Sequence, residues 1–248
     1  EMTDTDHRAA RSMSIATRLA TLDWGRIEAD LWARGYAQTS PILTRRDCQS
    51  LVTLYDDESC FRKRVDMARH RFGLGEYKYF ARPLPPMVEQ LRETLYPPLA
   101  TVANSWMDAL NTDIRYAPTL SAFLHHCAKL GQVQPTPLLL RYEAEGYNCL
   151  HQDLYGEAVF PLQVAAFLNR PGEDYTGGEF LLVEQRPRAQ SSGEAVLPTQ
   201  GTLVIFTTRM RPVAGTRGYY RVNVRHGVSR LHSGQRFTLG IIFHDAIT

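Results

Sequence analysis

The sequence lacks the features that mark several large protein classes. Its longest apolar runs, such as "GTLVIFTT" and "LGIIF", are far shorter than the roughly 20 residues that a membrane-spanning helix needs. The charged, apolar and small-residue regions of a secretory signal are missing near the start. No C-x-x-C pair occurs, so a zinc knuckle or a thioredoxin-type motif is not expected. These absences predict that the protein has no membrane association.

The composition defines a class of protein but not a partner. Of 248 residues, 44% are hydrophobic and 22% are charged, which suits a folded core and not a disordered chain. The formal net charge of +2 is too small to identify a binding partner. Four unclustered cysteines suit free thiols in a reducing cytoplasm, which is the location that we predict. They are Cys48, Cys60, Cys127 and Cys149.

The first half of the chain is typical of helices. Residues 1–13 are polar and are expected to be mobile, whereas 14–131 contain apolar residues at helical spacing. One helix is expected around Trp24–Trp32 and another after the near-capping box that begins at Thr44. A long helix is expected over much of 86–110, with a break or kink at Pro97 and Pro98. A further helix is expected over roughly 118–130, and residues 61–82 look extended and irregular.

The second half is typical of strands. From residue 137 onward, about seven short runs rich in Val, Ile, Leu, Phe and Tyr alternate with glycine-containing turn signals. Strands and helices do not alternate, which argues against a doubly wound sheet. The predicted fold class is therefore α+β, with a double-stranded β-helix (jelly-roll) core at 137–246 under a helical N-terminal layer. Residues 14–248 would form a single domain.

The stretch "YNCLHQDLYGE" holds the first candidate site residues. His151 and Asp153 are two residues apart, so in a strand their side chains point to the same face. A late strand containing "VRHGVSR" supplies His226, which a jelly roll can bring beside them. Two histidines and one carboxylate on one face of an ion form the facial triad that non-haem iron(II) uses. Such a site leaves about three of the six octahedral positions open for other ligands.

A basic residue near this triad suggests an anionic co-substrate. Arg236 follows His226 by ten residues and opens the strand "RFTLGIIF". Its guanidinium could bind the far end of a dicarboxylate through two hydrogen bonds. Thr238 shares its face by the same alternation and could add a hydroxyl. Tyr142, nine residues before His151, could supply a phenol or could simply pack in the core.

These spacings resemble the iron(II)/2-oxoglutarate-dependent dioxygenases. The pattern His151-x-Asp153, then His226, then Arg236 is the one that carries the resemblance, which covers about 137–246. The stretch "RYEAEGYNCLHQD" is similar to the matching stretch of the alkylated-DNA-repair branch. Two features differ from that branch: Leu140 stands where the repair enzymes have asparagine, and their co-substrate arginine lies further from the distal histidine than Arg236 does. The whole chain also resembles a prokaryotic oxygenase family assigned by analogy to damaged nucleic acid. A "YLN…GGE" hairpin of the prolyl-hydroxylase-like branch is matched by Phe167, Leu168, Asn169, Gly177, Gly178 and Glu179.

The resemblance implies a set of cofactors and a reaction. Iron(II) would be held by His151, Asp153 and His226, and the C5 carboxylate of 2-oxoglutarate by Arg236. Dioxygen would complete the set. The implied reaction is hydroxylation of an unactivated C–H bond, with 2-oxoglutarate converted to succinate and carbon dioxide; on an N-methyl group it would release formaldehyde. Members that halogenate lack the carboxylate ligand, so Asp153 favours hydroxylation.

Other functions fit parts of the pattern. The same chemistry could act on a peptide or prolyl residue, or on a small molecule. A cupin-like hydrolase or isomerase could use the triad with zinc or manganese, but it has no need of a dicarboxylate clamp such as Arg236. A non-catalytic binding module that kept the barrel is a third reading, against which the intact triad argues.

Two basic groups raise the question of a nucleic-acid partner. Basic groups follow a phosphate backbone, and aromatic rings stack on unpaired bases, so segment 61–82 could form a lid for single-stranded or damaged nucleic acid. The other reading is an ordinary pair of strands with a solvated face. The basic residues of 61–82 are Arg62, Lys63, Arg64, Arg69, Arg71, Lys78 and Arg82. A second basic group precedes His226 and contains Arg209, Arg211, Arg217 and Arg221.

Overall fold

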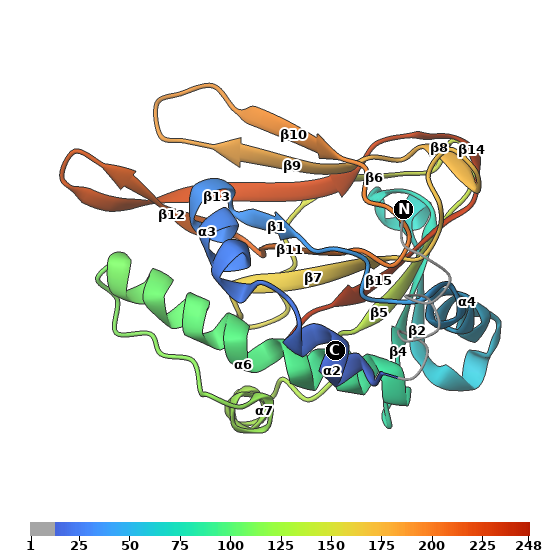
Figure 1. The fold of residues 1–248 in the computed structure, drawn as a ribbon, viewed down its shortest axis with the longest axis horizontal. Coiled ribbons are helices and arrows are strands. Elements are labelled where there is room, and N and C mark those ends of the chain that lie inside the picture. The colour runs from blue at the N-terminus through green and yellow to red at the C-terminus, as the bar shows by residue number, and fades with distance from the viewer. Residues whose placement is uncertain (1–12) are drawn as a thin grey trace.

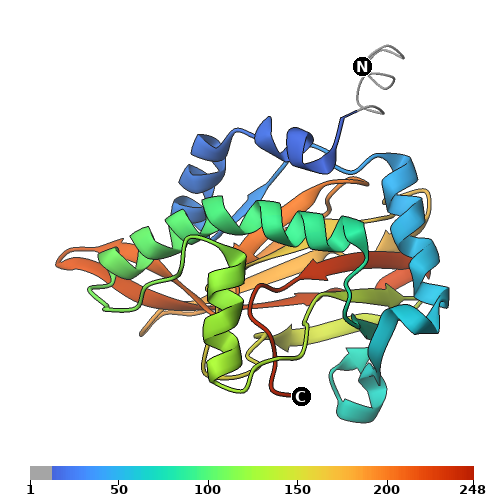
Figure 2. The same ribbon diagram turned by 90° about the horizontal axis from the view of Figure 1, so that it is seen from below.

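Two antiparallel sheets face each other, and helices cover the outer side of the larger one (Figures 1 and 2). This arrangement is seen in a computed structural model that describes residues 13–248. The expectation for 1–13 therefore lies, apart from Met13, outside the described residues. The two-sheet arrangement is the one that the strand-rich second half predicted.

The larger sheet has seven strands and carries the co-substrate side of the cavity described below. Its central strands are buried on both faces, because helices pack on one side and the smaller sheet lies on the other. In spatial order the strands are β1 (Tyr36–Gln38), β11 (Leu203–Thr207), β7 (Leu162–Phe167), β15 (Arg236–Ile241), β5 (Leu138–Tyr142), β4 (Glu76–Phe80) and β2 (Phe61–Asp66).

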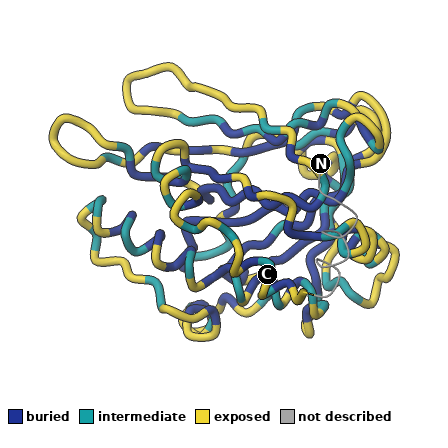
Figure 3. The backbone as a smooth tube through the Cα atoms, in the orientation of Figure 1, coloured by how far each residue is buried: buried dark blue, intermediate teal, exposed yellow. Residues whose placement is uncertain are grey.

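The smaller sheet has one face toward the larger sheet and one toward solvent. Its longest strand, β13, alternates between exposed and buried residues over most of its length, as a half-buried antiparallel strand does. In Figure 3 the loops of the β9–β10 and β12–β13 hairpins are exposed, whereas the strands in the interior of the molecule are mostly buried. The order is β10 (Ser192–Val196), β9 (Phe180–Gln185), β13 (Gly218–Val228), β6 (Tyr147–His151) and β3 (Gly73–Leu74), with β12 (Met210–Gly215) paired to β13. A separate pair is formed by β14 (Leu231–Gly234) and β8 (Tyr175–Gly177).

Side-chain caps begin most of the helices. Thr44 and Asp47 form the predicted capping box, each side chain accepting from the other residue's backbone N–H. Among residues 13–248 no helix is both long enough and apolar enough to cross a bilayer. The α-helices are α2 (Ile15–Ala20), α3 (Trp24–Arg34), α4 (Arg45–Thr53), α5 (Met67–His70), α6 (Pro86–Ala109) and α7 (Leu120–Lys129), and the 3₁₀ turns are η1 (Leu54–Asp56) and η2 (Glu58–Cys60).

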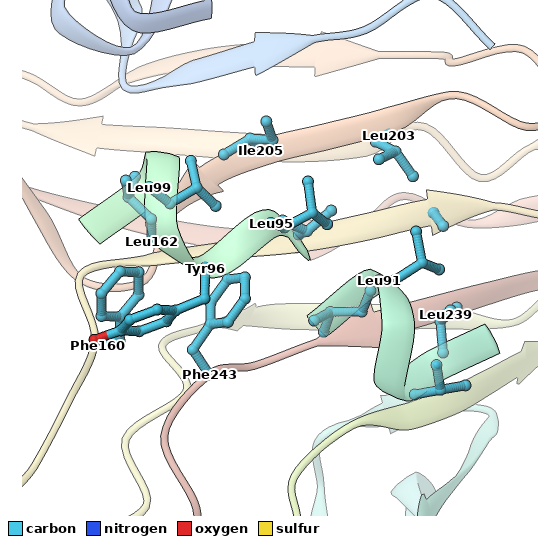
Figure 4. Close-up of a cluster of buried hydrophobic side chains, with 14 of the residues drawn as sticks. Leu91, Leu95, Tyr96, Leu99, Phe160, Leu162, Leu203, Ile205, Leu239 and Phe243 are labelled. Carbon is cyan, nitrogen blue, oxygen red and sulfur yellow. The ribbon is translucent and has the colours of Figure 1, made fainter. Parts of the chain in front are cut away.

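Helix α6 supports the larger sheet from outside. One face of the helix is buried against the sheet, and each fully buried leucine stabilises this contact by about 1.5–3 kcal/mol. Figure 4 shows this cluster, in which the side chains of α6 meet those of the sheet and of the segments beside it. The labelled members are Leu91, Leu95, Tyr96, Leu99, Phe160, Leu162, Leu203, Ile205, Leu239 and Phe243.

The expected break at Pro97 and Pro98 is wrong, because α6 runs unbroken through both residues. A proline inside a helix removes one hydrogen bond to the carbonyl four residues earlier. Here the carbonyls concerned belong to Glu93 and Thr94. Glu93 and Pro97 are exposed, and Thr94 and Pro98 are half-buried, so this stripe of the helix faces away from the sheet. Water can therefore solvate the freed carbonyl groups, while the buried leucines hold the helix straight enough to pack.

The expectation that segment 61–82 is extended is confirmed, and the reading of it as a pair of strands is the one that the structure shows, whereas the expectation of an irregular segment is wrong. Strands β2 and β4 pair with each other, and β4 pairs with β5 at the edge of the larger sheet. With β1, the first half of the chain thus contributes three strands to this sheet. The period-two pattern was hidden because most of the alternate positions in this segment carry basic or aromatic residues rather than small aliphatic ones.

A buried ion pair joins α6 to the end of the chain. The Arg92 guanidinium is fully buried and donates to the carbonyls of Ile242 (3.0 Å) and Phe243 (2.8 Å) and to the Asp245 carboxylate (2.9 Å). Burial lowers the pKa of Arg92, and the Asp245 charge opposes this shift. These bonds fix the segment that follows β15, and β15 carries Arg236.

Arg92→Met should therefore destabilise the fold. The substitution keeps much of the side-chain volume but leaves the Asp245 carboxylate buried with only Arg82 as a partner. Removing one member of a buried ion pair costs about 3–5 kcal/mol. Urea unfolding followed by circular dichroism would measure the loss, and a change below about 1 kcal/mol would contradict this role for the pair.

Candidate metal and co-substrate site

Two neighbouring strands bring the three candidate metal ligands together. His151 is the last residue of β6, and His226 lies directly opposite it on β13 in the antiparallel register. Asp153 follows two residues after His151. One donor atom from each residue lies within 4.8 Å of the others. The structure thus assembles the predicted triad from segments about 75 residues apart.

The distances within the triad are those of groups that could share an ion. Asp153 Oδ2 lies 3.1 Å from His226 Nε2, and Asp153 Oδ1 lies 3.6 Å from His151 Nε2. The two imidazole rings are 4.3 Å apart between centroids. Two neutral nitrogen donors and a carboxylate are the donor set that suits iron(II), with the remaining positions open.

Hydrogen bonding orients His151 for this task. Its Nδ1 lies 2.7 Å from the Cys149 carbonyl oxygen. A carbonyl can only accept, so Nδ1 carries the proton and Nε2 keeps a free lone pair toward Asp153. Metal-binding histidines are commonly held this way. His226 is held instead by packing, since its ring lies 4.9 Å from Phe206 and 6.1 Å from Phe180 between centroids.

The electrostatics of the triad keep the donors in their metal-binding forms. Burial raises the pKa of Asp153, but the nearby charges of His226 and His151 outweigh it and hold that pKa well below its usual range. Burial lowers the pKa of His226, and the charge of His151 adds to this effect. An ionised carboxylate and a neutral imidazole at neutral pH are the states that bind a metal.

A tyrosine pair that the sequence did not suggest supports the carboxylate. Tyr155 donates from its hydroxyl to Asp153 Oδ1 (2.9 Å), and the Tyr79 and Tyr155 hydroxyls are 3.0 Å apart. Burial, followed by the charge of Asp153, raises the pKa of Tyr155, so this phenol keeps its proton and stays a donor. The bond occupies Oδ1 and leaves Oδ2 directed at His226.

Arg236 lies in the same cavity and lacks enough partners. Its side chain is only 1% exposed, and Nη1 donates to Thr238 Oγ1 (2.9 Å). Nε and Nη2 have no hydrogen-bond partner among the described residues. A buried guanidinium with two free donors is costly unless an anion completes it. A carboxylate is the group that fits, because it accepts two parallel N–H bonds.

Aromatic rings and a glycine shape the space around Arg236. Its guanidinium carbon lies 5.6 Å from the centre of the Tyr142 ring and 5.0 Å from that of Phe167. Tyr142 pairs directly with Arg236 across β5 and β15, and Asn148 donates to its hydroxyl at 3.0 Å. Burial raises the pKa of Tyr142 to about 12. Gly178 has a φ of +65°, and a Cβ there would lie 3.2 Å from Arg236 Cδ and closer still to Leu231.

The triad and Arg236 open into one cavity between the sheets. Its volume is about 390 Å³, and its walls come from β5, β7 and β15 on one side and β6, β9 and β13 on the other. All the residues predicted for the site line it: His151, Asp153, His226, Arg236, Thr238 and Tyr142. Four other histidines of the second half and of α7 do not line it: His125, His126, His232 and His244.

Comparison with protein families shows which family the chain belongs to. A model of the Oxygenase-NA family, described as "Oxygenase, catalysing oxidative methylation of damaged DNA", matches residues 75–246, which is more than half of the chain. The chain belongs to the Oxygenase-NA family. Two relatives from Mycobacterium tuberculosis, the uncharacterized proteins MT2286 (strain CDC 1551 / Oshkosh) and Rv2227 (strain ATCC 25618 / H37Rv), are each 50% identical over 167 residues. The matched part is 67% of this chain and 72% of each relative.

Solved structures confirm the predicted fold. A Pseudomonas putida prolyl-4-hydroxylase has a TM-score of 0.51 and 16% identity, covering 90% of this chain and 98% of its own. An oxidoreductase of the 2OG-Fe(II) oxygenase family from Burkholderia pseudomallei has a TM-score of 0.50 and 15% identity, covering 90% and 92%. Membership of the Oxygenase-NA family identifies the chain as an oxygenase, and its fold is the one that the 2OG-Fe(II) oxygenase from Burkholderia pseudomallei also has. The hydrolase reading is therefore set aside.

Three further cavity residues were missed from the sequence. Gln163 on β7 is 3% exposed, and its amide nitrogen has no hydrogen-bond partner among the described residues. Asn148 and Tyr155 hold Tyr142 and Asp153 as described above. The position of Tyr155, two residues after Asp153, was a signal for it, but alternation ends with β6 at His151, so the spacing could not show where the ring points.

Tyr155→Phe should weaken metal binding by this Oxygenase-NA protein. The substitution removes the hydroxyl that holds Asp153 while keeping the ring, and loss of such a supporting bond lowers metal affinity about 10–100-fold. Titration with manganese(II), followed by the electron paramagnetic resonance signal of the free ion, measures this without turnover.

Tyr116→Phe is the matched control. Tyr116 is largely buried and donates to the Val159 carbonyl (3.0 Å), but it does not line the cavity. Its loss should lower stability without changing the manganese affinity. Equal affinities in the Tyr155 variant and the unaltered protein would remove Tyr155 from the site.

Proposed function

We propose that this oxygenase binds iron(II) through His151, Asp153 and His226 and binds the C5 carboxylate of 2-oxoglutarate through Arg236. The observation that carries the proposal is the buried Arg236 guanidinium, with Nε and Nη2 unpaired in the cavity that holds the triad. A metal site alone would suit many reactions. A metal site beside a buried dicarboxylate anchor suits one that uses 2-oxoglutarate.

Each residue has a separate task in this proposal. The triad presents its donors from one side, so 2-oxoglutarate and dioxygen can occupy the positions opposite. Thr238 fixes the guanidinium of Arg236, and Tyr142 packs against it in the wall. The bound metal and co-substrate supply the oxidising power for a C–H bond. The protein supplies orientation and a largely apolar enclosure.

We propose a nucleobase carrying a small alkyl lesion as the group that is oxidised. The description of the Oxygenase-NA family as acting on damaged DNA supports this choice. The cavity wall contains the charged or titratable residues of the proposed site, which are His151, Asp153, His226 and Arg236. Among the other described residues that line the cavity, Arg71 is the only one with a charged nitrogen group. Aromatic side chains able to stack on a flat ring also line the cavity: Phe72, Tyr77 and Tyr155.

The ion pairs of segment 61–82 reduce the number of its basic residues that could contact a nucleic acid. Arg64 pairs with Glu76, Lys78 with Glu58 and Arg82 with Asp245. Arg69 pairs with Asp66, and the Arg62 guanidinium lies over the Tyr79 ring. These groups are engaged within the protein. We therefore restrict the nucleic-acid role of this segment to Arg71 and Phe72, which line the cavity, and to Lys63, which is exposed and forms no ion pair with a described residue.

A prolyl residue is the second candidate for the oxidised group. A proline ring is uncharged and would fit the same walls. The solved structures of similar fold include a prolyl-4-hydroxylase, but 16% identity carries the fold alone.

Two other sequence predictions belong to this proposal: a single domain over 14–248 and a cytoplasmic location. The four free cysteines are the only ground for the location.

The cofactor proposal is tested by spectroscopy without oxygen. Adding iron(II) and 2-oxoglutarate to the protein should produce a metal-to-ligand charge-transfer band. Turnover on a panel of methylated oligonucleotides, prolyl peptides and small carboxylates then ranks the substrates by succinate formed. Formaldehyde release from a methylated oligonucleotide would favour the base, and hydroxyproline from a peptide would overturn it.

Replacing any triad member by alanine should abolish iron-dependent succinate formation. His151→Ala, Asp153→Ala and His226→Ala each leave two ligands where three are needed. His126→Ala is the control, since His126 is exposed on α7 and lies outside the cavity. Full activity in any triad variant would exclude that residue as a ligand.

Arg236→Gln should raise the 2-oxoglutarate concentration required for half-maximal turnover. Loss of a charge-assisted pair in a buried site costs about 2–5 kcal/mol, which corresponds to roughly tens- to thousands-fold in affinity. Iron binding should change little, because Arg236 contacts none of the triad. The same substitution at Arg230, which is exposed and pairs with Glu145, is the control. An unchanged 2-oxoglutarate requirement in Arg236→Gln would contradict the assignment.

A further inference from the structure

We propose that a groove on the outer face of the smaller sheet binds the sugar-phosphate backbone of a single-stranded nucleic acid whose base enters the cavity. The inference rests on the proposed function and extends it to a second surface. The groove has a volume of about 300 Å³. It is lined by Leu150, Gln152, Val183, Gln185, Ser191, Arg209, Asn223 and Arg225.

Strand alternation places this groove behind the candidate metal site. On β13 the His226 side chain is buried between the sheets, whereas Asn223 and Arg225 are exposed on the other face. The register sets Asn223 opposite Gln185 and Arg225 opposite Val183 on β9. The groove floor is therefore the solvent face of the strands whose inner face carries the triad.

The groove and the cavity meet at a shared rim. Leu150 and Gln152, on either side of His151, line both spaces. The Gln152 amide donates to the carbonyls of Arg209 (3.0 Å) and Val224 (2.9 Å), which joins the end of β6 to the start of the β12–β13 hairpin. A chain lying in the groove thus passes a fixed edge beside the cavity.

The charge of the groove favours a polyanion. Arg209 and Arg225 are exposed and form no ion pair with any described residue. No carboxylate lines the groove, and its other polar groups are neutral amides and hydroxyls. The contrast with Arg211 is informative, because Arg211 is buried against Glu184 and is not available. Arginine, amide and hydroxyl donors are the groups that contact phosphates.

The enclosed position of the triad explains why the bound nucleic acid would be single-stranded. A base in a duplex cannot reach a cavity between two sheets unless it leaves the stack. A backbone held on the outer face can direct one unpaired nucleotide over the rim at Gln152. Arg71, which lines the cavity itself, could contact a phosphate at the mouth.

The test is the salt dependence of oligonucleotide binding. A fluorescein-labelled oligothymidylate of about 12 nucleotides, long enough for a typical single-strand site, is titrated with the full-length protein and followed by anisotropy over a series of salt concentrations. Each phosphate neutralised on a single strand contributes about −0.7 to the log–log slope. The double variant Arg209→Gln/Arg225→Gln should flatten the slope by about 1.4. Arg209→Lys/Arg225→Lys should restore most of the slope.

The control variant has the same change of charge on the same hairpin. Arg217→Gln/Arg221→Gln replaces two exposed arginines that lie outside the groove. It should keep the slope of the unaltered protein. Equal flattening in both double variants would mean diffuse attraction and would overturn the groove. Stronger binding of polyglutamate than of the oligonucleotide would overturn it in favour of an acidic peptide.

Failure of the proposed function would look different. A missing charge-transfer band with iron(II) and 2-oxoglutarate would refute the cofactor proposal, whatever the oligonucleotide does. A normal band with no oligonucleotide binding at low salt would leave the cofactor proposal standing and would overturn the groove.

Discussion

The cross-strand pair of His151 and His226 fixes where every other group of the site lies. The two residues face each other in the register of β6 and β13, and a slip of β13 by one residue would turn its side chains to the opposite face. The hydrophobic alternation of β13 opposes such a slip, since Val222 and Val224 must face the core. The same force that buries two valines therefore also sets two imidazole rings 4.3 Å apart. The geometry of the candidate metal site thus follows from core packing.

Strand register and burial also position Arg236, on the other sheet. It pairs with Tyr142 across β5 and β15, and its side chain is buried in a wall of aromatic groups. A guanidinium in such a wall stays costly while Nε and Nη2 lack partners. A dicarboxylate that reaches both Arg236 and the metal would satisfy these donors. The two ends of such a co-substrate would be held from opposite walls of the cavity, so its length would have to match their separation.

Elements with local signals were predictable from the sequence. Alternation placed Arg236 beside Thr238, and the Thr44 capping box marked the start of α4. The two-residue spacing of His151 and Asp153 marked the candidate site, although β6 ends at His151. What the sequence could not show depends on long-range contacts. The pairing of Tyr79 with Tyr155 spans 76 positions. Helix α6 continues through its prolines because the sheet packs against its other face. The basic segment 61–82 contains two paired strands, and three of its basic side chains form ion pairs with Glu58, Glu76 and Asp245.

The alternation of side chains along strand β13 is one physical constraint that links these observations. Alternate side chains of one strand point to opposite faces, so β13 presents His226 to the cavity and Arg225 to the outer groove at adjacent positions. No hinge or loop separates the two faces, and the distance between them is fixed by a single peptide unit. A substrate that contacts both would be positioned by the sheet itself and would not require a lid to close. The ion pairs of Lys78 with Glu58 and of Arg82 with Asp245 are consistent with this, because they join segment 61–82 to residues outside it.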